Sequence, residues 1–515
     1  MYLQQLISQK QAQIPRARTQ VASIPAPVFG WNARDPLSDM DPRFALVLDN
    51  YFPDGNDVRQ RLGNVQHATG FTGNVETLHV ARFGNSEQLI AFANNASYNA
   101  TGGGAIGGPL GSGFTNSRWI GANAGASGGE TALYTNGVDP AQAYDGTAWG
   151  ASTITGPSKP TGITVAHKRV WVIDNGTGDA WYGAVEAVGG AFTKFSIGTV
   201  VPSGGDLIAI SAMTLDGGNG PEDVTIFVMR SGAIVVYAGF DPSDAANWAL
   251  RGVWQGGHPI GDRCLVPFDK DVIYISDAGF QSILAFTTGG GVSGVPISDN
   301  IRRAVSDAAR DFAGNFGWNG VFDPRTRQLV MNIPVVEGRT SEQYAMNTSV
   351  AWRPWCRFKD VNLFSQAVTT ERRYVGVNGA VWIADSGGTD VNEPIAGTWQ
   401  SAWSYFQPRG QEKIFRQFRP HIRSDSNLNL STGFGTDFRD PNVTAVGGSS
   451  GQTGGKWNES QWNTTPWASG LRNERPWLGA FNNGYNGSVV IKTQTSNVTV
   501  QILATDVVYE TGDIL

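Results

Sequence analysis

Between residues 60 and 400 the sequence repeats one theme: an apolar or alternating run, a Gly or Asp turn, a second run, and a Gly-rich break. Short runs of this kind predict strands buried on both faces. The paired runs are Val75–Ala81 with Gln88–Ala93, Thr131–Thr135 with Gln142–Gly146, Ile163–Ala166 with Arg169–Asp174, Leu207–Ile210 with Val224–Val228, Cys264–Phe268 with Val272–Ser276, Asn319–Phe322 with Gln328–Ile333, and Arg373–Val377 with Ala380–Ala384. Their spacing of roughly 40 to 55 residues is that of a four-stranded propeller blade. The pattern therefore predicts an all-β fold, a degenerate β-propeller of about six or seven blades.

The amino-acid composition agrees with a turn-rich β protein, and the net charge does not favour nucleic acid as a binding partner. The 515 residues include 66 Gly and 25 Pro, and only 16% are charged, which is unlike a protein of long charged helices. The formal net charge of −6 gives no electrostatic reason to expect strong binding to nucleic acid. The only cysteines, Cys264 and Cys356, cannot form a disulfide framework and are expected as buried thiols. No membrane span or signal peptide is expected, so the chain is predicted to be made and kept in a cytoplasm.

The sequence before and after the repeats has a different character. Residues 1–29 are Gln-rich, with apolar residues at roughly helical spacing, and are expected as an N-terminal arm. After about residue 400, Gly-rich loops and scattered Trp lead to two closing strands, so 401–515 is expected as an additional C-terminal β-domain for attachment. The predicted division is therefore 1–60 for the arm and lead-in, 61–400 for the propeller, and 401–515 for the C-terminal domain.

The lead-in segment, residues 30–64, joins the arm to the first repeat. It contains two Asp-Pro steps, Asp35-Pro36 and Asp41-Pro42, each able to start a short turn. An apolar run, Phe44–Leu48, follows, and Val58–Leu62 alternates as a half-solvated strand would. We expect this segment to pack outside the propeller, against the C-terminal domain or a neighbouring subunit. One helix is also predicted, over 299–312, with Ser298 as its cap.

Residue patterns that carry catalysis are weak in this chain. The five histidines are scattered, and Gly125–Gly129 matches a nucleophile motif only inside a Gly, Ala and Ser loop that lacks the required helix. The oxygen-rich loops 174–179 and 216–220 lack calcium-loop spacing. The sequence thus predicts no catalytic residue, no metal site and no cofactor, and we expect a protein that is not an enzyme.

One block combines basic and aromatic residues after residue 400. Its basic members are Arg409, Lys413, Arg416, Arg419 and Arg423. Basic residues between aromatics suit nucleic-acid binding, but alternating Arg and Phe is also typical of a half-buried strand whose arginines pair with a neighbour. We favour the structural interpretation, in which these five residues are candidates for inter-subunit or adaptor contacts.

Several segments together resemble the tail nozzle family of short-tailed bacteriophages, also called tail hub or tail tubular proteins. The resemblance is carried by Gly30 to Asn64, Val165 to Trp171, Leu207 to Val236, Gly261 to Ser282, the helix after Ser298, Trp318 to Pro334, Trp457 to Trp467, and Leu503 to Glu510. It covers most of the chain and is weakest over 440–480.

The resemblance implies a structural protein of the virion, assembled in the cytoplasm of the host bacterium. Its copies would form a ring, typically a hexamer, around an axial channel. The ring would attach above to adaptor and portal proteins and below or at its side to needle, fibre or spike proteins. It would retain the genomic DNA and then release it, without sequence-specific contacts.

A second interpretation comes from a different class: a β-propeller that binds carbohydrate or hydrolyses glycosidic bonds. The 17 Trp could stack on sugars, but Trp171 and Trp382 lie inside apolar strand patterns and are expected in the core. A propeller glycosidase also needs paired carboxylates at its axial funnel, and the sequence places none there.

Overall fold

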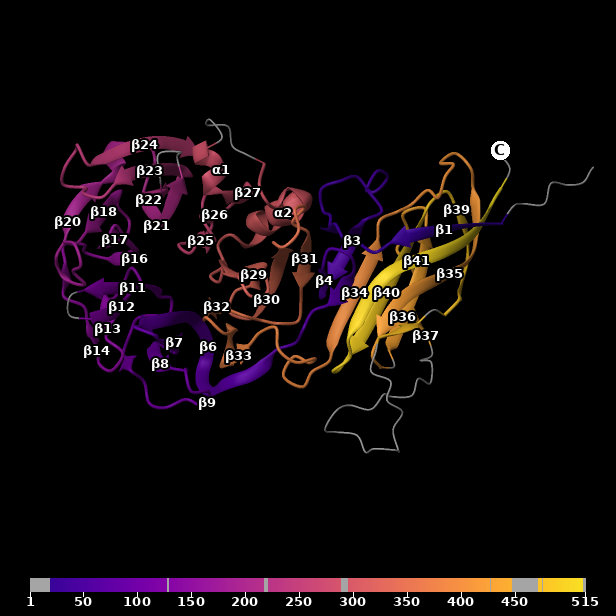
Figure 1. Ribbon diagram of the computed structural model, residues 1–515, viewed down its shortest axis with the longest axis horizontal. Coiled ribbons are helices and arrows are strands. Elements are labelled where there is room, and N and C mark those ends of the chain that lie inside the picture. The colour runs from indigo at the N-terminus through magenta and orange to yellow at the C-terminus, as the bar shows by residue number, and fades with distance from the viewer. Residues whose placement is uncertain are drawn as a thin grey trace, which may run out of the picture.

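Two bodies make up the computed structural model: a ring of blades and a β-domain beside it (Figure 1). The structure describes residues 19–512 except 127–128, 217–220, 289–294, 427, 447–470 and 475. Residues 1–18, the start of the predicted arm, and Trp457, Trp462 and Trp467 lie outside this part of the chain.

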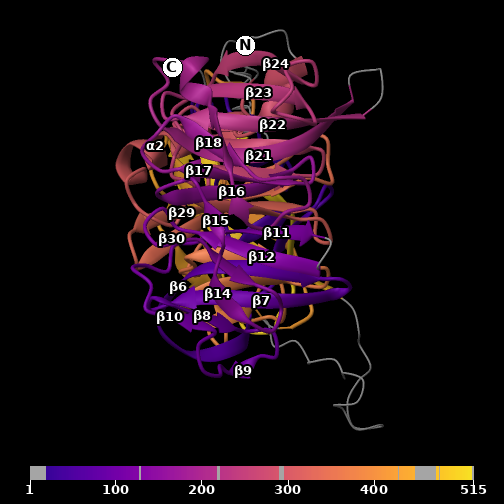
Figure 2. The same ribbon diagram turned by 90° about the vertical axis from the view of Figure 1, so that its left-hand side faces the viewer.

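The ring contains seven small sheets. Their innermost strands contact one another in a closed circle: β6, β11, β16, β21, β25, β28 and β32. Blade 1 consists of the second part of β6 (Val65–Phe83), β7 (Ser86–Ala93), β8 (Ala96–Asn99) and β10 (Gly111–Ser112), and blade 2 of β11 (Ile120–Ala126), β12 (Gly129–Thr135), β13 (Gln142–Tyr144) and β14 (Trp149–Ala151). Blade 3 consists of β16 (Pro160–Ala166), β17 (Arg169–Asp174), β18 (Asp179–Tyr182) and β20 (Thr193–Ser196). Blade 4 consists of β21 (Leu207–Asp216), β22 (Pro221–Met229), β23 (Ala233–Gly239) and β24 (Trp248–Gln255). Figure 2 shows these four blades on the side facing away from the second body.

Blades 5 to 7 complete the circle. Blade 5 consists of β25 (Leu265–Phe268), β26 (Asp271–Ser276) and β27 (Gly279–Ser282). Blade 6 consists of β28 (Asn319–Asp323), β29 (Gln328–Val336), β30 (Thr340–Asn347) and β31 (Trp355–Phe358). Blade 7 consists of β32 (Ser365–Val368), β33 (Arg373–Ile383) and the first part of β6. Short extra elements are β9 (Gly104–Ala105), β15 (Ile154–Thr155), β19 (Gly190–Ala191), the 3-10 turn η1 (Ile197–Thr199) and helix α1 (Ile283–Thr288). The predicted all-β propeller is therefore confirmed, with seven blades.

Strand β6 closes the ring because it belongs to two blades. Residues 65–74 pair with β33 of blade 7, whereas residues 75–83 pair with β7 of blade 1. The expected hairpin of Arg373–Val377 and Ala380–Ala384 is wrong, since both runs lie in the single strand β33, whose register shifts twice along β6. The chain enters the propeller and closes it with the same strand.

Neighbouring blades adhere through apolar side chains. Phe92 of blade 1 stacks on Trp119, which precedes blade 2, with ring centroids 5.6 Å apart. Between blades 3 and 4, Trp171 stacks on Trp248 at 5.6 Å, and Trp171 is fully buried as the sequence predicted. Trp382 is half-buried against the apolar cluster of blade 7. Burial of such large aromatic areas is the main stabilising contribution at these contacts.

The predicted helix forms but starts differently. A 3-10 turn, η2 (Asp299–Ile301), leads into α2 (Arg302–Phe312), whose Val305 and Ala308 are buried. Ser298 is not its side-chain cap. Its Oγ instead accepts a hydrogen bond from the Phe280 amide at 3.0 Å and so fixes the helix to blade 5.

The second body, called the C-terminal β-domain from here on, is a sandwich of two sheets. One contains β1 (Thr19–Pro25), β4 (Tyr51–Pro53), β5 (Val58–Gln60), β35 (Lys413–Ser424), β38 (Arg472–Glu474), β39 (Leu478–Gly484) and β41 (Val500–Thr511). The other contains β2 (Gly30–Trp31), β3 (Phe44–Asp49), β34 (Ile395–Ser401), β36 (Asn429–Thr436), β37 (Thr444–Val446) and β40 (Gly487–Thr495). Phe415 and Phe434 meet between the sheets, with centroids 4.8 Å apart.

This domain is built from both ends of the chain. Residues 19–25, expected in a free arm, form β1 and pair along β41. Residues 395–400, expected in the propeller, lie in β34 between β3 and β40. Alternating strands look alike whichever sheet they join, so the sequence boundaries at 60 and 400 do not coincide with those of the two bodies.

Candidate assembly surfaces

A continuous sheet joins the two bodies. The outer strand of blade 6, β31, pairs with β2 and β3 of the lead-in segment, and β3 pairs with β34. Ten strands of blade 6 and the C-terminal β-domain thereby form one hydrogen-bonded sheet. The lead-in segment thus lies outside the ring of inner strands and connects blade 6 to the C-terminal β-domain (Figure 1).

Buried polar contacts reinforce this junction. The guanidinium of Arg61 binds both carboxylate oxygens of Asp390, with one Nη1–Oδ1 distance of 2.9 Å, and its Nε donates to Asn50 at 2.8 Å. Asn64 also donates to Asp390, at 2.6 Å. The Arg61 side chain is only 4% exposed. The alternating pattern of Val58–Leu62 predicted a half-solvated strand, so the burial of Arg61 was not predicted from the sequence.

A second ion pair lies one strand away in the same junction. Arg357 of β31 donates to both carboxylate oxygens of Asp49 in β3, at 2.7 and 3.0 Å. Lys359 and Glu342 extend the pair into a small network, with an Nζ–Oε1 distance of 3.3 Å. Side-chain charges and main-chain hydrogen bonds therefore fix blade 6 and the lead-in segment in a single register.

The predicted contact residues of the basic block lie on or next to β35 and divide between its two faces. Arg416 and Arg419 are on the outer face and pair with Glu510 and Asp506 of β41, each at 2.8 Å. Arg423 lies on the same exposed face and is not without a partner. Arg409 precedes the strand, is exposed, and pairs with Asp39 of the lead-in segment at 3.0 Å.

Hydrogen bonds alter the acidity of the carboxylates on this face. The bond from Arg416 lowers the pKa of Glu510. Burial alone would raise the pKa of Asp506, but hydrogen bonds from Arg419 and His421 lower it. The outer face is thus a ladder of paired charges, not an open cationic surface that would attract a polyanion.

Lys413 is a correction to the predicted contact set. Its side chain is fully buried, and its Nζ donates to the carbonyls of Pro408 at 2.7 Å and Gln411 at 2.8 Å. Burial lowers its pKa from the ordinary value. Strand alternation puts Lys413 on the inner face together with Phe415, so it cannot contact another chain.

One end of the propeller axis is crossed by Arg263, which immediately precedes the inner strand of blade 5. Its guanidinium donates to the carbonyl of Glu76 at 3.0 Å and to the Thr77 hydroxyl at 2.7 Å, both in blade 1. It also donates to the Trp119 carbonyl at 2.9 Å, next to blade 2. Because blade 5 lies across the ring from blades 1 and 2, this side chain spans the axis. Nothing in the sequence pattern distinguishes Arg263 from a surface arginine.

Ion pairs occupy two carboxylates at the same end. Arg118 contacts Glu76 at 3.3 Å and Glu337 at 2.9 Å, and its guanidinium lies 4.2 Å from the centroid of the Phe316 ring. A glycosidase needs one carboxylic acid and one free carboxylate flanking the sugar bond. Two carboxylates bound to one arginine do not offer that arrangement.

The histidines considered in the sequence analysis do not come together in one site. His79 contacts the Tyr134 hydroxyl between blades 1 and 2, and burial lowers its pKa to about 4. His421 instead contacts Asp506 on the outer face of β35 at 2.7 Å. Among the residues described, no group of three or more His, Cys, Asp or Glu side chains is arranged to hold a metal ion. In the same residues, no helix is long and apolar enough to cross a membrane.

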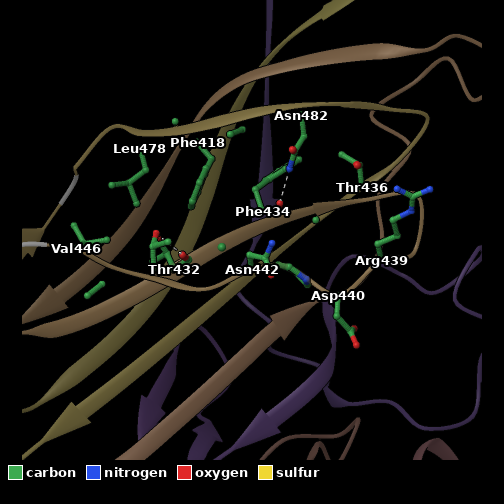
Figure 3. A pocket seen from close by; sticks show the side chains of 17 residues that line it. Phe418, Thr432, Phe434, Thr436, Arg439, Asp440, Asn442, Val446, Leu478 and Asn482 are labelled. Carbon is green, nitrogen blue, oxygen red and sulfur yellow. Dashed lines mark hydrogen bonds between the residues drawn. The ribbon is translucent and has the colours of Figure 1, made fainter.

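Two hollows lie in the C-terminal β-domain. One, of about 560 Å³, lies between β36, β39, β37 and the loop 439–443 (Figure 3). Phe418, Phe434 and Leu478 form its apolar side, and Asn482 donates to the Phe434 carbonyl at 2.7 Å. The second, of about 640 Å³, lies between β1, the loop 38–42 of the lead-in segment and residues 403–409.

The known proteins that resemble this chain share little of its sequence. No protein-family model and no curated protein matches the sequence. Among solved structures, BBS1N in complex with ARL6DN aligns at a TM-score of 0.41 and 9% identity, over 63% of this chain and 97% of that one. YCF48 from Cyanidioschyzon merolae aligns at 0.35 and 12%, over 63% and 95%. The computationally designed Ika8 protein aligns at 0.34 and 10%, over 63% and 97%. The strand pairing described above therefore defines the fold.

Proposed function

We propose that this chain is a structural component of a phage tail. Its copies form a ring-shaped nozzle or hub around the DNA channel, which attaches below the portal and adaptor and helps to retain and then eject the genome. The observation that carries the proposal is the ten-stranded sheet by which the lead-in segment joins blade 6 to the C-terminal β-domain. This same segment, residues 30–64, opens the sequence resemblance to tail nozzles.

The junction suits a part that bears mechanical load. Domains that move relative to one another are usually connected by exposed linkers with few crossing contacts. Here a ladder of main-chain hydrogen bonds and the buried Arg61–Asp390 pair cross the boundary. A subunit of this kind transmits force between its two bodies without bending at a hinge, as a ring that holds packaged DNA requires.

The charge of the chain is compatible with DNA moving past it. Each Lys or Arg contact to phosphate adds salt-dependent affinity, which would hold the DNA in place. The net charge is −6, and three of the five basic residues singled out by the sequence pair with carboxylates on the protein itself. We therefore propose that DNA passes through the ring without sequence-specific contacts and that the protein catalyses no reaction.

Imaging the purified chain by negative-stain electron microscopy, together with its native mass, tests the proposal. We expect a closed ring, of six copies on the family resemblance, that binds a portal and adaptor complex. The Arg61→Met variant, which weakens the junction described above but leaves the outer surface unchanged, should assemble less completely or bind the adaptor less tightly. Arg59→Met, at a residue that is 50% exposed, is its matched control. A monomer that binds or cleaves glycans would overturn the proposal in favour of the carbohydrate-binding propeller.

A further inference from the structure

The groove beside β1 has the features of a peptide-binding site. Its floor is aromatic and apolar: Trp403 is 4% exposed, and Phe406 and Met40 are also buried. The hydroxyl of Tyr509 lies 2.6 Å from the Phe406 carbonyl oxygen and fixes the loop that forms one wall. The cavity of about 640 Å³ is in the size range of sites that bind small molecules or side chains of a peptide.

One wall of the groove is a strand edge. Residues 22–24 of β1 line it, and β1 pairs with β41 along its other edge. Within the described part of the chain, β41 is the only strand that pairs with β1, so the other edge of β1 is unpaired. An unpaired edge beside an apolar floor is the arrangement to which extended segments add as an extra strand.

The chemistry of this chain's own tail complements the groove. The N-terminal tail, residues 1–18, contains Lys10, Arg16 and Arg18 but no Asp or Glu, and its apolar residues include Leu3, Leu6 and Ile7. The rim of the groove carries Asp39 and Asp41, whose side chains are 61% and 37% exposed. Arg409 and Arg43 pair with these carboxylates at 3.0 and 2.7 Å, so an arginine of the tail would share or replace these exposed ion pairs.

Chain direction favours the groove of another copy. The tail joins β1 at Thr19, which is opposite Glu510, whereas the groove lies further along the strand at residues 22–24. A tail that continues in the direction of β1 therefore leaves its own groove behind. At ~3.3 Å per extended residue, its 18 residues can span up to roughly 60 Å.

We propose that the N-terminal tail of each copy binds the β1 groove of the neighbouring copy and so links the ring. The inference rests on the proposed function, because it requires a ring of identical subunits. Each contact is head-to-tail, with tail and groove contributed by different surfaces, and such contacts close into rings when the rotation permits.

Engineered cysteines test the exchange in the full-length chain. The native Cys264 and Cys356 are both buried, and burial raises their thiol pKa, so they should not react. One variant carries Gln9→Cys in the tail, and a second carries Ser38→Cys at the groove. The two are mixed, unfolded and refolded together, assembled with or without the portal and adaptor complex, oxidised, and run on a non-reducing gel. Ser306→Cys, exposed on α2 away from the groove, replaces Ser38→Cys as the control.

We expect a disulfide-linked dimer from Gln9→Cys with Ser38→Cys, and at least ten times less from Gln9→Cys with Ser306→Cys. A ring without that dimer would overturn the tail exchange while leaving the nozzle proposal intact. Linkage only within one chain, seen when both cysteines are on the same copy, would also overturn it. Failure to form any ring would overturn both proposals.

Removal of the tail gives an independent measurement. A chain starting at residue 19 should keep the thermal unfolding temperature of the isolated subunit, because it retains β1. Its ring should dissociate on dilution at a concentration at least tenfold higher than the full-length ring. The substitutions Arg16→Glu and Arg18→Glu should produce a smaller shift in the same direction. Unchanged ring dissociation for the truncated chain would contradict the proposal.

Discussion

Neighbouring blades and the boundary between the two bodies are held by different kinds of contact. Blades 1 and 2 meet through aromatic rings, such as Phe92 on Trp119. Blade 6 and the C-terminal β-domain share a sheet, and the buried pair Arg61–Asp390 joins the two chain segments that connect the propeller to that domain. Apolar packing is non-directional and tolerates diverged sequences, whereas strand pairing and ion pairs fix one register. We therefore expect substitutions at the junction to destabilise the protein more than substitutions of similar size at a contact between blades.

The largest effect on this comparison is expected from Arg61→Met. The substitution leaves Asp390 buried without its cation, and breaking a buried pair in this way destabilises by about 3–5 kcal/mol. Equilibrium urea unfolding of the full-length chain measures it. Arg59→Met is the matched control, because Arg59 lies on β5 two residues before Arg61, is 50% exposed and pairs with Asp54 and Asp57, and exposed pairs contribute about 0.2–1 kcal/mol.

A double variant separates charge from packing at this position. Arg61→Met with Asp390→Leu removes both charges, and replacing a buried pair by apolar groups is often neutral. We expect it to recover most of the loss. Equal destabilisation by Arg59→Met and Arg61→Met would mean that the junction is no more dependent on buried charge than the surface.

Gly30→Ala tests the main-chain part of the junction. Gly30 has a φ of +84°, and a Cβ there would lie 2.4 Å from the Trp355 carbonyl oxygen of β31. Strain and overlap with a backbone atom together should destabilise by about 3 kcal/mol. Gly84→Ala is the control, since Gly84 has a φ of +59° with nothing within 4 Å, and should lose about 1 kcal/mol. Similar melting temperatures for the two variants would show that β2 and β31 can separate without loss.

Local patterns were enough to predict most of the propeller. The two runs of each of the first six pairs form adjacent strands, as with β16 and β17, because hairpins depend on residues close in sequence. The closing pair is different: Asn74 is opposite Asn378, and no local signal reports so distant a partner. The sequence pattern therefore predicted the number of blades to within one, but it did not predict which strands pair to close the ring.

The C-terminal β-domain was harder to predict for the same physical reason. Its strands come from residues 19–60 and from 395 onward, and alternation does not reveal which of them pair. Within β35 the prediction failed at Lys413, which alternation puts on the inner face together with Phe415. A register shift between Phe415 and Gln417 then brings Arg416, Arg419 and Arg423 together on the outer face, and the sequence pattern reports neither the shift nor the burial of Lys413.

Acid should weaken the seam between blades 1 and 2 through His79. Burial, followed by repulsion from Arg82, lowers the pKa of His79 from 6.5 to about 4. Between these pH values the unfolded chain binds a proton that the folded chain excludes, so stability is full above pH 6.5 and falls as the pH drops towards 4. The difference should reach about 2–3 kcal/mol.

The His79 effect is measured against a variant. In His79→Gln this proton is absent, so its urea midpoint should change less than that of the parent between pH 7 and pH 4. Carboxylates titrate in both proteins and cancel in the difference. Parallel pH profiles would mean that His79 accepts a proton without disturbing the seam.

The smallest expected effect returns to the junction. Tyr51 of β4 is fully buried, and its hydroxyl lies 2.7 Å from that of Thr493 in β40. Tyr51→Phe removes one hydrogen bond between β4 of the lead-in segment and β40, which lie in the two sheets of the C-terminal β-domain, and should destabilise by about 1 kcal/mol. Tyr485→Phe, at a residue 42% exposed, should stay within about 0.5 kcal/mol. If Tyr51→Phe has no effect while Arg61→Met has its full one, the rigidity of the junction comes from the ion pair and the strand ladder, and neutral side-chain hydrogen bonds merely accompany them.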